Sequence, residues 1–207
     1  LRQLGPQVIG TFKNLDCFDL LPLRYSVSDF SKATEYEYPV AVQNVEGIDC
    51  PEILSSLADG RSYSLKRSDL AEYDASKLAG FDDLEPMEKG SRIEAPIFKW
   101  LQKYLKDHYP QVSIEEDNNI YSNWNYRILA AKVDGLIKIK GILQGCLEIK
   151  TCIQSPSVAD CFKLPRMSNS PLQLDLKHQY WTQIQAYLHV MNLRFGILAV
   201  YFSKTHQ

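Results

Sequence analysis

The chain has 207 residues, a formal net charge of −2 and a hydrophobic content of 45%, as in an ordinary globular protein. No stretch of about 18 apolar residues occurs, so the sequence predicts no membrane-spanning segment. The slightly acidic balance argues against a protein that coats nucleic acid unspecifically, but it allows an enzyme with a local basic groove.

The five cysteines show no CxxC spacing, which argues against a zinc site and indicates reduced thiols. No secretory signal is visible, because no basic segment precedes an apolar one near the start of the sequence. We therefore expect an intracellular protein, whether cytoplasmic, nuclear or mitochondrial, and a viral origin is compatible with these features.

Residues 1–85 are repeatedly interrupted by proline and show little periodicity. Pro51 and the six residues after it are typical of a short helix that begins with proline, and Ser68–Tyr73 is predicted to open another helix. We expect residues 1–85 to form an α-rich N-terminal subdomain or arm, and residues 86–207 to form the main domain.

The first well-marked helix is predicted near residue 91. Residues 91–94 (SRIE) have the form of a capping box, and an apolar stripe follows them as far as Pro110. Because Pro96 lacks an N–H group, we expect the helix to start slightly later or to kink at this residue.

Alternating and β-branched residues predict a series of strands beyond this helix. The predicted strands are 112–116, 126–140, 143–152 and 195–203, with turns at 117–119 and at Gly141. The second of them consists of 126–134 and 136–140, which a bend or bulge at Gly135 joins. Residues 153–174 show no clear periodicity. Asp175 is predicted to cap a helix whose apolar face runs from Leu176 to Met191. The elements therefore follow the order α-β-β-β-α-β.

The strand at 143–152 carries a carboxylate and an ammonium group on one face. Side chains alternate along a strand, so Glu148 and Lys150 point to one side while Ile149 points into the core. Asp134 ends a neighbouring strand. Two carboxylates, the Ile149 carbonyl and Glu94 can supply the oxygen ligands that Mg²⁺ prefers, and the lysine can orient a water that attacks a phosphodiester.

Each of these residues also has a simpler explanation. Glu94 fits the third position of its capping box, and Asp134 fits a turn before a glycine. A Glu–Lys pair on one strand face fits a solvated surface of little energetic value. Gln183 and Gln185 fit polar positions on a half-exposed helix, and Tyr180 fits the core. A metal site is favoured because all these residues occur in order on fitting secondary structure.

The segment from about residue 88 to 203 resembles the PD-(D/E)XK nuclease superfamily, and within it the lambda exonuclease and YqaJ viral-recombinase branch. The pieces that carry this resemblance are Glu94, Val133-Asp134-Gly135-Leu136, Leu147-Glu148-Ile149-Lys150-Thr151-Cys152 and Tyr180-Trp181-Thr182-Gln183-Ile184-Gln185. The last piece is similar to the tyrosine and Q-x-Q helix of that branch.

A RecB-like nuclease domain is the second choice, because Gln183 and Tyr187 fit the Q-x-x-x-Y pattern of that group. The sequence departs from the phage-type pattern at two positions, which weakens the phage-type assignment relative to the RecB-like one. Thr151 separates Lys150 from Cys152, and Val133 precedes Asp134, whereas the phage branch often has proline just after a lysine–cysteine pair or before the aspartate. Neither departure removes a metal ligand.

The resemblance implies an α/β, restriction-endonuclease-like core with a central mixed sheet flanked by helices and an α-rich N-terminal extension. It implies that Asp134 and Glu148 bind the metal, with Glu94 as a further acidic ligand. It also implies that Lys150 is the catalytic lysine and that Gln183 orients the lysine, the water or the DNA end.

Substrate contacts are expected at the start of the last helix and in the segment 153–174. Tyr180 and Gln185 lie on the helix, and Lys163 and Arg166 in the segment are expected to grip the nucleic acid.

Together these features predict a Mg²⁺-dependent DNA nuclease, with Mn²⁺ able to substitute, that acts as an exonuclease in recombination, repair or genome processing. DNA is the expected partner, with a homo-oligomer or a recombination protein as further expected partners. Two alternatives remain open: a non-catalytic nucleic-acid-binding or assembly module on the same fold, and an RNA endonuclease. The complete set of acidic residues and lysine argues against the non-catalytic module.

Overall fold

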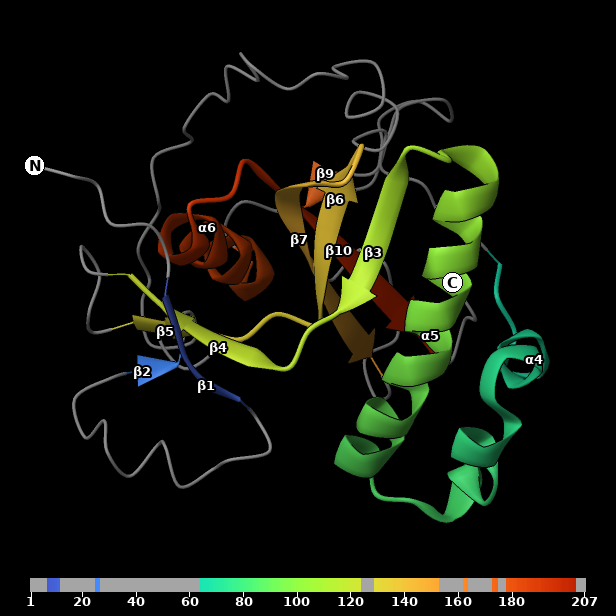
Figure 1. Ribbon diagram of the computed structural model, residues 1–207. Helices are drawn as coiled ribbons and strands as arrows, with labels where there is room; N and C mark the ends of the chain where they lie inside the picture. The colour runs from blue at the N-terminus through green and yellow to red at the C-terminus, as the bar shows by residue number, and fades with distance from the viewer. Residues whose placement is uncertain are drawn as a thin grey trace, which may run out of the picture. The chain divides into compact units, whose positions relative to one another are not determined.

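The computed structural model describes residues 7–11, 25–26, 64–123, 129–152, 162–163, 173–174 and 178–203. Its helices and central sheet form a mixed α/β fold that is consistent with the predicted restriction-endonuclease-like core (Figure 1). Within this described part of the chain, no helix is both long enough and apolar enough to cross a membrane.

Four strands form the central sheet in the order β10-β7-β6-β3. Their bounds are Val112–Glu116 for β3, Gly135–Ile139 for β6, Ile142–Cys152 for β7 and Phe195–Phe202 for β10. With the helices α5 (Pro86–His108) and α6 (Gln179–Met191), they occur along the chain as α5-β3-β6-β7-α6-β10. The predicted order α-β-β-β-α-β is therefore confirmed.

β6 and β7 form an antiparallel hairpin that turns at Lys140 and Gly141. Both residues have positive φ, 50° for the lysine and 79° for the glycine. Two successive residues with positive φ are typical of the tight turns that join antiparallel strands, and glycine adopts this conformation readily. The turn predicted at Gly141 is confirmed.

A second sheet has the strand order β1-β4-β5-β2. Its strands are Gln7–Thr11 (β1), Tyr25–Ser26 (β2), Asn119–Ser122 (β4) and Leu129–Ala131 (β5). β1 pairs antiparallel with β4 and β4 with β5, whereas β2 pairs parallel with β5.

Two predictions about this region are wrong. Asn119 was expected in a turn but begins β4, because pairing with β1 far away in the sequence outweighs its local turn preference. The strand expected over 126–134 is shorter, and its described part ends at Ala131. Asp134 lies outside the strand, in a bend just before β6.

The chain divides into two compact units. The first contains the described residues within Leu1–Asn44, Ile114–Glu148 and Leu176–Ile197, and the second contains those within Val45–Ser113, Ile149–Asp175 and Leu198–Gln207. Along the sequence, the boundary falls between Glu148 and Ile149 of β7.

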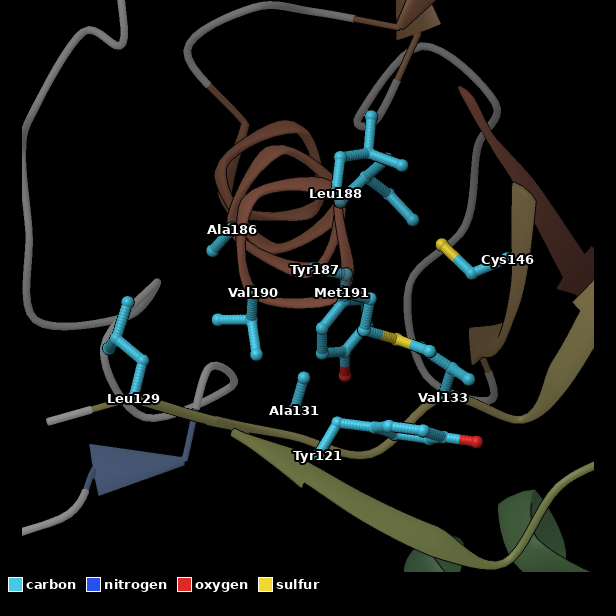
Figure 2. Packing of buried hydrophobic residues seen from close by; sticks show 11 residues of the cluster. Tyr121, Leu129, Ala131, Val133, Cys146, Ala186, Tyr187, Leu188, Val190 and Met191 are labelled. Carbon is cyan, nitrogen blue, oxygen red and sulfur yellow. The ribbon is translucent and has the colours of Figure 1, made fainter. Parts of the chain in front are cut away.

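The core of the first unit forms between α6 and the strands β4 and β5 (Figure 2). Its buried members are Tyr121, Leu129, Ala131, Val133, Cys146, Ile184, Ala186, Tyr187, Leu188, Val190 and Met191. The Asn123 side chain donates a hydrogen bond to the Val190 carbonyl at 3.2 Å, which ties the end of β4 to the helix. The predicted apolar face of the helix therefore belongs to the core from Ile184 to Met191, whereas Tyr180 is only half-buried.

α6 begins later than predicted. His178 is the residue before the first turn, and its Nδ1 accepts a hydrogen bond from the Tyr180 N–H at 3.2 Å. A ring nitrogen thus takes the capping role expected of Asp175, which lies outside the described residues. The helix ends at Asn192, whose positive φ of 53° is typical of a residue that closes a helix.

The second unit contains α4 (Arg67–Leu78), a short 3₁₀ turn at Phe81–Asp83 and α5. The Asp69 carboxylate accepts a hydrogen bond from the Lys66 N–H at 2.8 Å and satisfies one free donor at the start of α4. Lys99 on α5 forms an ion pair with Asp74 on α4 at 2.9 Å. The helix predicted to open at Ser68–Tyr73 is confirmed.

α5 differs from the prediction at its start. Pro86 occupies the first helical position, where its missing N–H costs nothing, so residues 91–94 lie inside the helix and form no capping box. The helix also continues through Pro96. Pro96, Ile93 and Ile97 are all buried, and this burial offsets the hydrogen bond that the proline cannot make.

Three sequence expectations fall on residues that are only partly described. Phe162–Lys163 (β8) and Gln173–Leu174 (β9) pair antiparallel within the segment for which no element was predicted. The short helix predicted after Pro51 lies outside the described residues. The division into an arm of residues 1–85 and a domain of residues 86–207 stays a prediction.

Close packing between β7 and β10 depends on Gly145. A Cβ atom at this position would lie 2.7 Å from the Phe195 carbonyl oxygen and 2.8 Å from two carbons of its ring. We expect Gly145→Ala to lower the free energy of unfolding by about 1–3 kcal/mol, because backbone and ring must both shift. Urea unfolding measures this loss, and Leu143→Ala at an exposed position of the same strand should change the value by less than about 0.5 kcal/mol. Equal stability of both variants would contradict this account.

Candidate functional site

The hairpin register brings two predicted acidic residues together. Gly135 pairs with Leu147 at the end of the hairpin ladder, so Asp134, just before the one, and Glu148, just after the other, lie at the same end of the hairpin. The Asp134 N–H donates a hydrogen bond to the Leu147 carbonyl at 3.1 Å and holds this bend against β7. The charges of both carboxylates act on the thiol of Cys146, so the two acidic groups share one part of the first unit.

Glu148 is buried, with only 4% of its surface exposed. The Gln183 Nε2 group donates a hydrogen bond to Glu148 Oε1 at 2.7 Å. Gln183 itself is 3% exposed. Glu148 is therefore not part of a solvated Glu–Lys pair, and Gln183 is not a half-exposed polar residue, so both simpler explanations are wrong. A buried carboxylate is costly without hydrogen bonds, and the amide of α6 provides one.

The same amide also contacts an aromatic hydroxyl. Gln183 Nε2 donates to the Tyr187 hydroxyl at 2.6 Å, and both residues lie on α6 one turn apart. Tyr187 is 2% exposed and belongs to the hydrophobic core of the first unit (Figure 2). Two bonds fix the orientation of the amide, so Glu148 receives its hydrogen bond from a rigid donor.

The thiol of Cys146 lies in an electronegative environment near Glu148 and Asp134. Burial raises the pKa of its thiol well above the usual range, and the negative charges of Glu148 and Asp134 raise it further. The cysteine precedes Glu148 by two residues on β7, so both side chains lie on one face of the strand. Cys146 is therefore a buried, reduced thiol that stays protonated beside two acidic side chains.

Lys150 lies two residues beyond Glu148 on β7 and is half-buried. By alternation, its side chain leaves the strand on the same face as Glu148, while Ile149 is buried with 2% exposure. Because Glu148 is also buried, burial does not distinguish the two faces, and the facing pattern of the three residues stays a prediction. The roles of Lys150 as the catalytic lysine and of the Ile149 carbonyl as a ligand stay predictions.

Glu94 belongs to the second unit, where it is half-buried on α5. It lies in the interior of the helix, which begins at Pro86, so the explanation of Glu94 as the third residue of a capping box is wrong. Its part in a metal site together with the carboxylates of the first unit stays a prediction.

The predicted substrate-contacting residues are described unevenly. Tyr180 is half-buried in the first turn of α6, and its ring meets His178 edge to face with centroids 4.3 Å apart. Gln185 is half-buried on the same helix. Lys163 lies in β8, of which the backbone is described, and Arg166 lies outside the described residues.

The sequence analysis missed Asp117, which it treated only as a turn residue. Its N–H donates a hydrogen bond to the Asp134 carbonyl at 3.4 Å, and its side chain is 6% exposed. Asp117 Oδ1 accepts a hydrogen bond from the Asn119 side chain at 2.8 Å. Asp117 thus helps to hold the bend that carries Asp134. An aspartate followed by asparagine is so common in turns that no local signal distinguished this one.

The donor chemistry of the site fits one kind of cation. Within the described ranges, no group of three or more His, Cys, Asp or Glu side chains is placed to hold a metal ion. Mg²⁺, however, is commonly held by one or two carboxylates and completes its octahedron with waters and substrate phosphates. Asp134 and Glu148 therefore offer the donor type that a hard divalent cation prefers, although they are too few for an all-protein cage.

Comparison with known proteins gives one match. The family model described as the YqaJ-like viral recombinase domain matches residues 47–194, which is more than two thirds of the chain and includes Asp134, Glu148, Lys150 and Gln183. No curated protein matches the chain, and no solved structure matches it.

The bond between Gln183 and Glu148 yields a stability prediction. We expect Gln183→Ala to lower the free energy of unfolding by about 1–3 kcal/mol, because it leaves a buried carboxylate without its amide donor. Gln185→Ala on the same helix removes a half-buried amide and should change the value by less than about 0.5 kcal/mol. Urea unfolding of both variants measures the difference. Similar losses in the two variants would show that the bond contributes nothing specific.

Proposed function

The chain belongs to the YqaJ-like viral recombinase family and has a nuclease role in recombination, and we propose that it is a Mg²⁺-dependent deoxyribonuclease that shortens DNA from its ends. Mn²⁺ is expected to substitute for Mg²⁺, and the proposed setting includes DNA repair and genome processing. The observation that carries this proposal is the buried Glu148 carboxylate, which accepts a hydrogen bond from Gln183 and lies on the strand that carries Lys150, with Asp134 at the same end of the hairpin.

Asp134 and Glu148 would hold the cation through their carboxylate oxygens, with the Ile149 carbonyl and Glu94 as further proposed ligands. A bound Mg²⁺ would neutralise charge on the phosphate, lower the pKa of an attacking water and stabilise the leaving oxygen. Gln183 keeps the Glu148 carboxylate in one orientation, so that its position does not change between binding and reaction.

Lys150 performs the part of the chemistry that carboxylates cannot. Its ammonium group donates hydrogen bonds and carries a positive charge, so it can orient the attacking water and balance the negative charge that develops on the phosphate. Placement on the face of Glu148 brings this charge to the same side of β7 as the carboxylate. An uncharged side chain of similar length lacks this stabilisation.

The remaining substrate contacts are proposed for groups next to the carboxylates along the fold. Tyr180 and Gln185 lie on the helix that carries Gln183, and half-buried side chains there can still contact a nucleotide. Lys163 and Arg166 are proposed to bind phosphates of the DNA, because cations in the segment 153–174 add the local positive charge that the chain as a whole lacks.

The first experiment is cleavage of linear, end-labelled duplex DNA in Mg²⁺, in Mn²⁺ and in EDTA. We expect the wild type to shorten the DNA only with metal, and Lys150→Ala to lose on the order of 100-fold or more in rate, as for removal of one electrostatic stabiliser. The ladder of labelled products then gives the polarity of digestion.

Lys138→Ala is the matched control, because Lys138 is also a strand lysine and its ion pair with Glu115 lies at the surface. Full activity of this variant, beside an inactive Lys150→Ala that still binds Mn²⁺, supports the proposal. Cleavage of RNA but not DNA would show that the substrate is RNA and that the proposed deoxyribonuclease activity is wrong. Absence of both cleavage and metal binding in a folded wild type would favour the non-catalytic module.

Lys163 and Arg166 are tested by the salt dependence of DNA binding. If both contact phosphates, the double variant Lys163→Ala/Arg166→Ala should bind duplex DNA more weakly and lower the slope of log K against log salt by about 0.9 per lost contact. Lys103→Ala/Lys106→Ala removes the same charge from exposed positions of α5 and should leave the slope unchanged. Equal slopes for the two double variants would show that Lys163 and Arg166 do not contact DNA phosphates.

A further inference from the structure

Gly90 lies in the interior of α5, where glycine is one of the poorest helix formers. It is buried, and a Cβ atom at this position would lie 2.7 Å from the Thr151 Oγ1 atom. An alanine at this position requires the helix, the threonine or both to move. Glycine therefore permits an approach between α5 and the end of β7 that a residue with a Cβ atom allows only after one of the two shifts.

Thr151 follows Lys150 directly on β7. By alternation, Thr151 and Ile149 leave the strand on the face opposite to Lys150, and Thr151 is the residue of this face that meets α5 at Gly90. A β-branched side chain is stiff at χ1, so Thr151 cannot easily turn away from the helix. The contact between Gly90 and Thr151 therefore constrains the β7 backbone next to Lys150.

Glu94 lies one helical turn after Gly90 and hence on the same face of α5. Ile93 and Ile97, which flank it, are buried with 0% and 4% exposure. This packing leaves the helix little freedom to rotate about its axis. The distance between helix and strand at Gly90 therefore sets how closely Glu94 approaches the end of β7 that carries Ile149 and Lys150.

We infer that Gly90 and Thr151 form a spacing pair that positions Glu94 beside the Ile149–Lys150 end of β7. All of these residues belong to the second unit. Gly90 is a positioning residue, because it acts through Glu94 and touches neither cation nor substrate. The inference rests on the proposed function, since it takes Glu94 as a metal ligand, but the packing pair can be tested without any activity.

The first test is a double-mutant cycle on thermal stability in the absence of metal. Gly90→Ala should lower Tm by about 2 °C or more. In Gly90→Ala/Thr151→Ala the loss should disappear, because the atom that clashes with the new Cβ is gone. Losses that add in the double variant would overturn the spacing pair. If Gly90→Ala does not fold alone, a folded double variant supports the pair and an unfolded one overturns it.

The second test is Mn²⁺ affinity, measured by calorimetry, together with the cleavage rate. Gly90→Ala should weaken Mn²⁺ binding about 10- to 100-fold, as for residues that orient metal ligands, and Thr151→Ala should restore it in the double variant. Ser91→Ala, at the next and exposed position of α5, is the matched control and should bind Mn²⁺ like the wild type.

The link to Glu94 is decided by combining Gly90→Ala with Glu94→Gln. If Gly90 acts through Glu94, the combined variant binds Mn²⁺ no more weakly than Glu94→Gln alone; multiplied losses would overturn the inference. A wild type that binds Mn²⁺ but cleaves no DNA would refute the proposed nuclease and leave this result valid. Unchanged Mn²⁺ affinity in Gly90→Ala, with the expected fall in Tm, would reduce the pair to packing and overturn its positioning role.

Discussion

The carboxylate of Glu148 lies almost entirely away from solvent, and the rest of the first unit must accommodate it. A buried negative charge destabilises a fold unless hydrogen bonds or a cation compensate for it. One compensation is the amide of Gln183, which is useful only while α6 stays packed on β4 and β5. The hydrophobic core around Tyr187 therefore does more than stabilise the unit (Figure 2). It fixes the donor on which the buried charge depends.

A bound cation is the second compensation under the proposed function. Asp134 adds another negative charge near Glu148, and both raise the pKa of the Cys146 thiol beside them. Like charges repel each other, and a cation held by both carboxylates would lessen that repulsion. A cation that binds the folded chain but not the unfolded chain would also stabilise the fold by mass action. The proposed function therefore couples folding to metal binding at this site.

The sequence predicted the elements whose signals are local and strong. Alternation identified β3, β6 and β7, and helical periodicity identified α6, because each of these patterns is imposed by a buried face. It misjudged elements that depend on distant partners. β4 exists through pairing with β1, and α5 continues through Pro96 because its apolar face is buried. Neither the pairing nor the burial is visible in a window of neighbouring residues.

The site follows the same division. Asp134, Glu148, Lys150 and Gln183 could be named as candidates from the sequence, because strand spacing and short family motifs are local properties. The residues that hold acidic groups in place could not. Asp117 supports Asp134 through a backbone hydrogen bond, which leaves no trace in residue type.

Gly90 shows most clearly what the sequence alone cannot predict, because its role depends on having no side chain where α5 meets Thr151. A glycine within a helical pattern reads locally as a weakness of the helix. Only the close approach to β7 shows why a better helix former would be worse at this position. The candidate catalytic residues can thus be identified one by one in the sequence, whereas a residue such as Gly90 can be interpreted only together with the residue that it contacts.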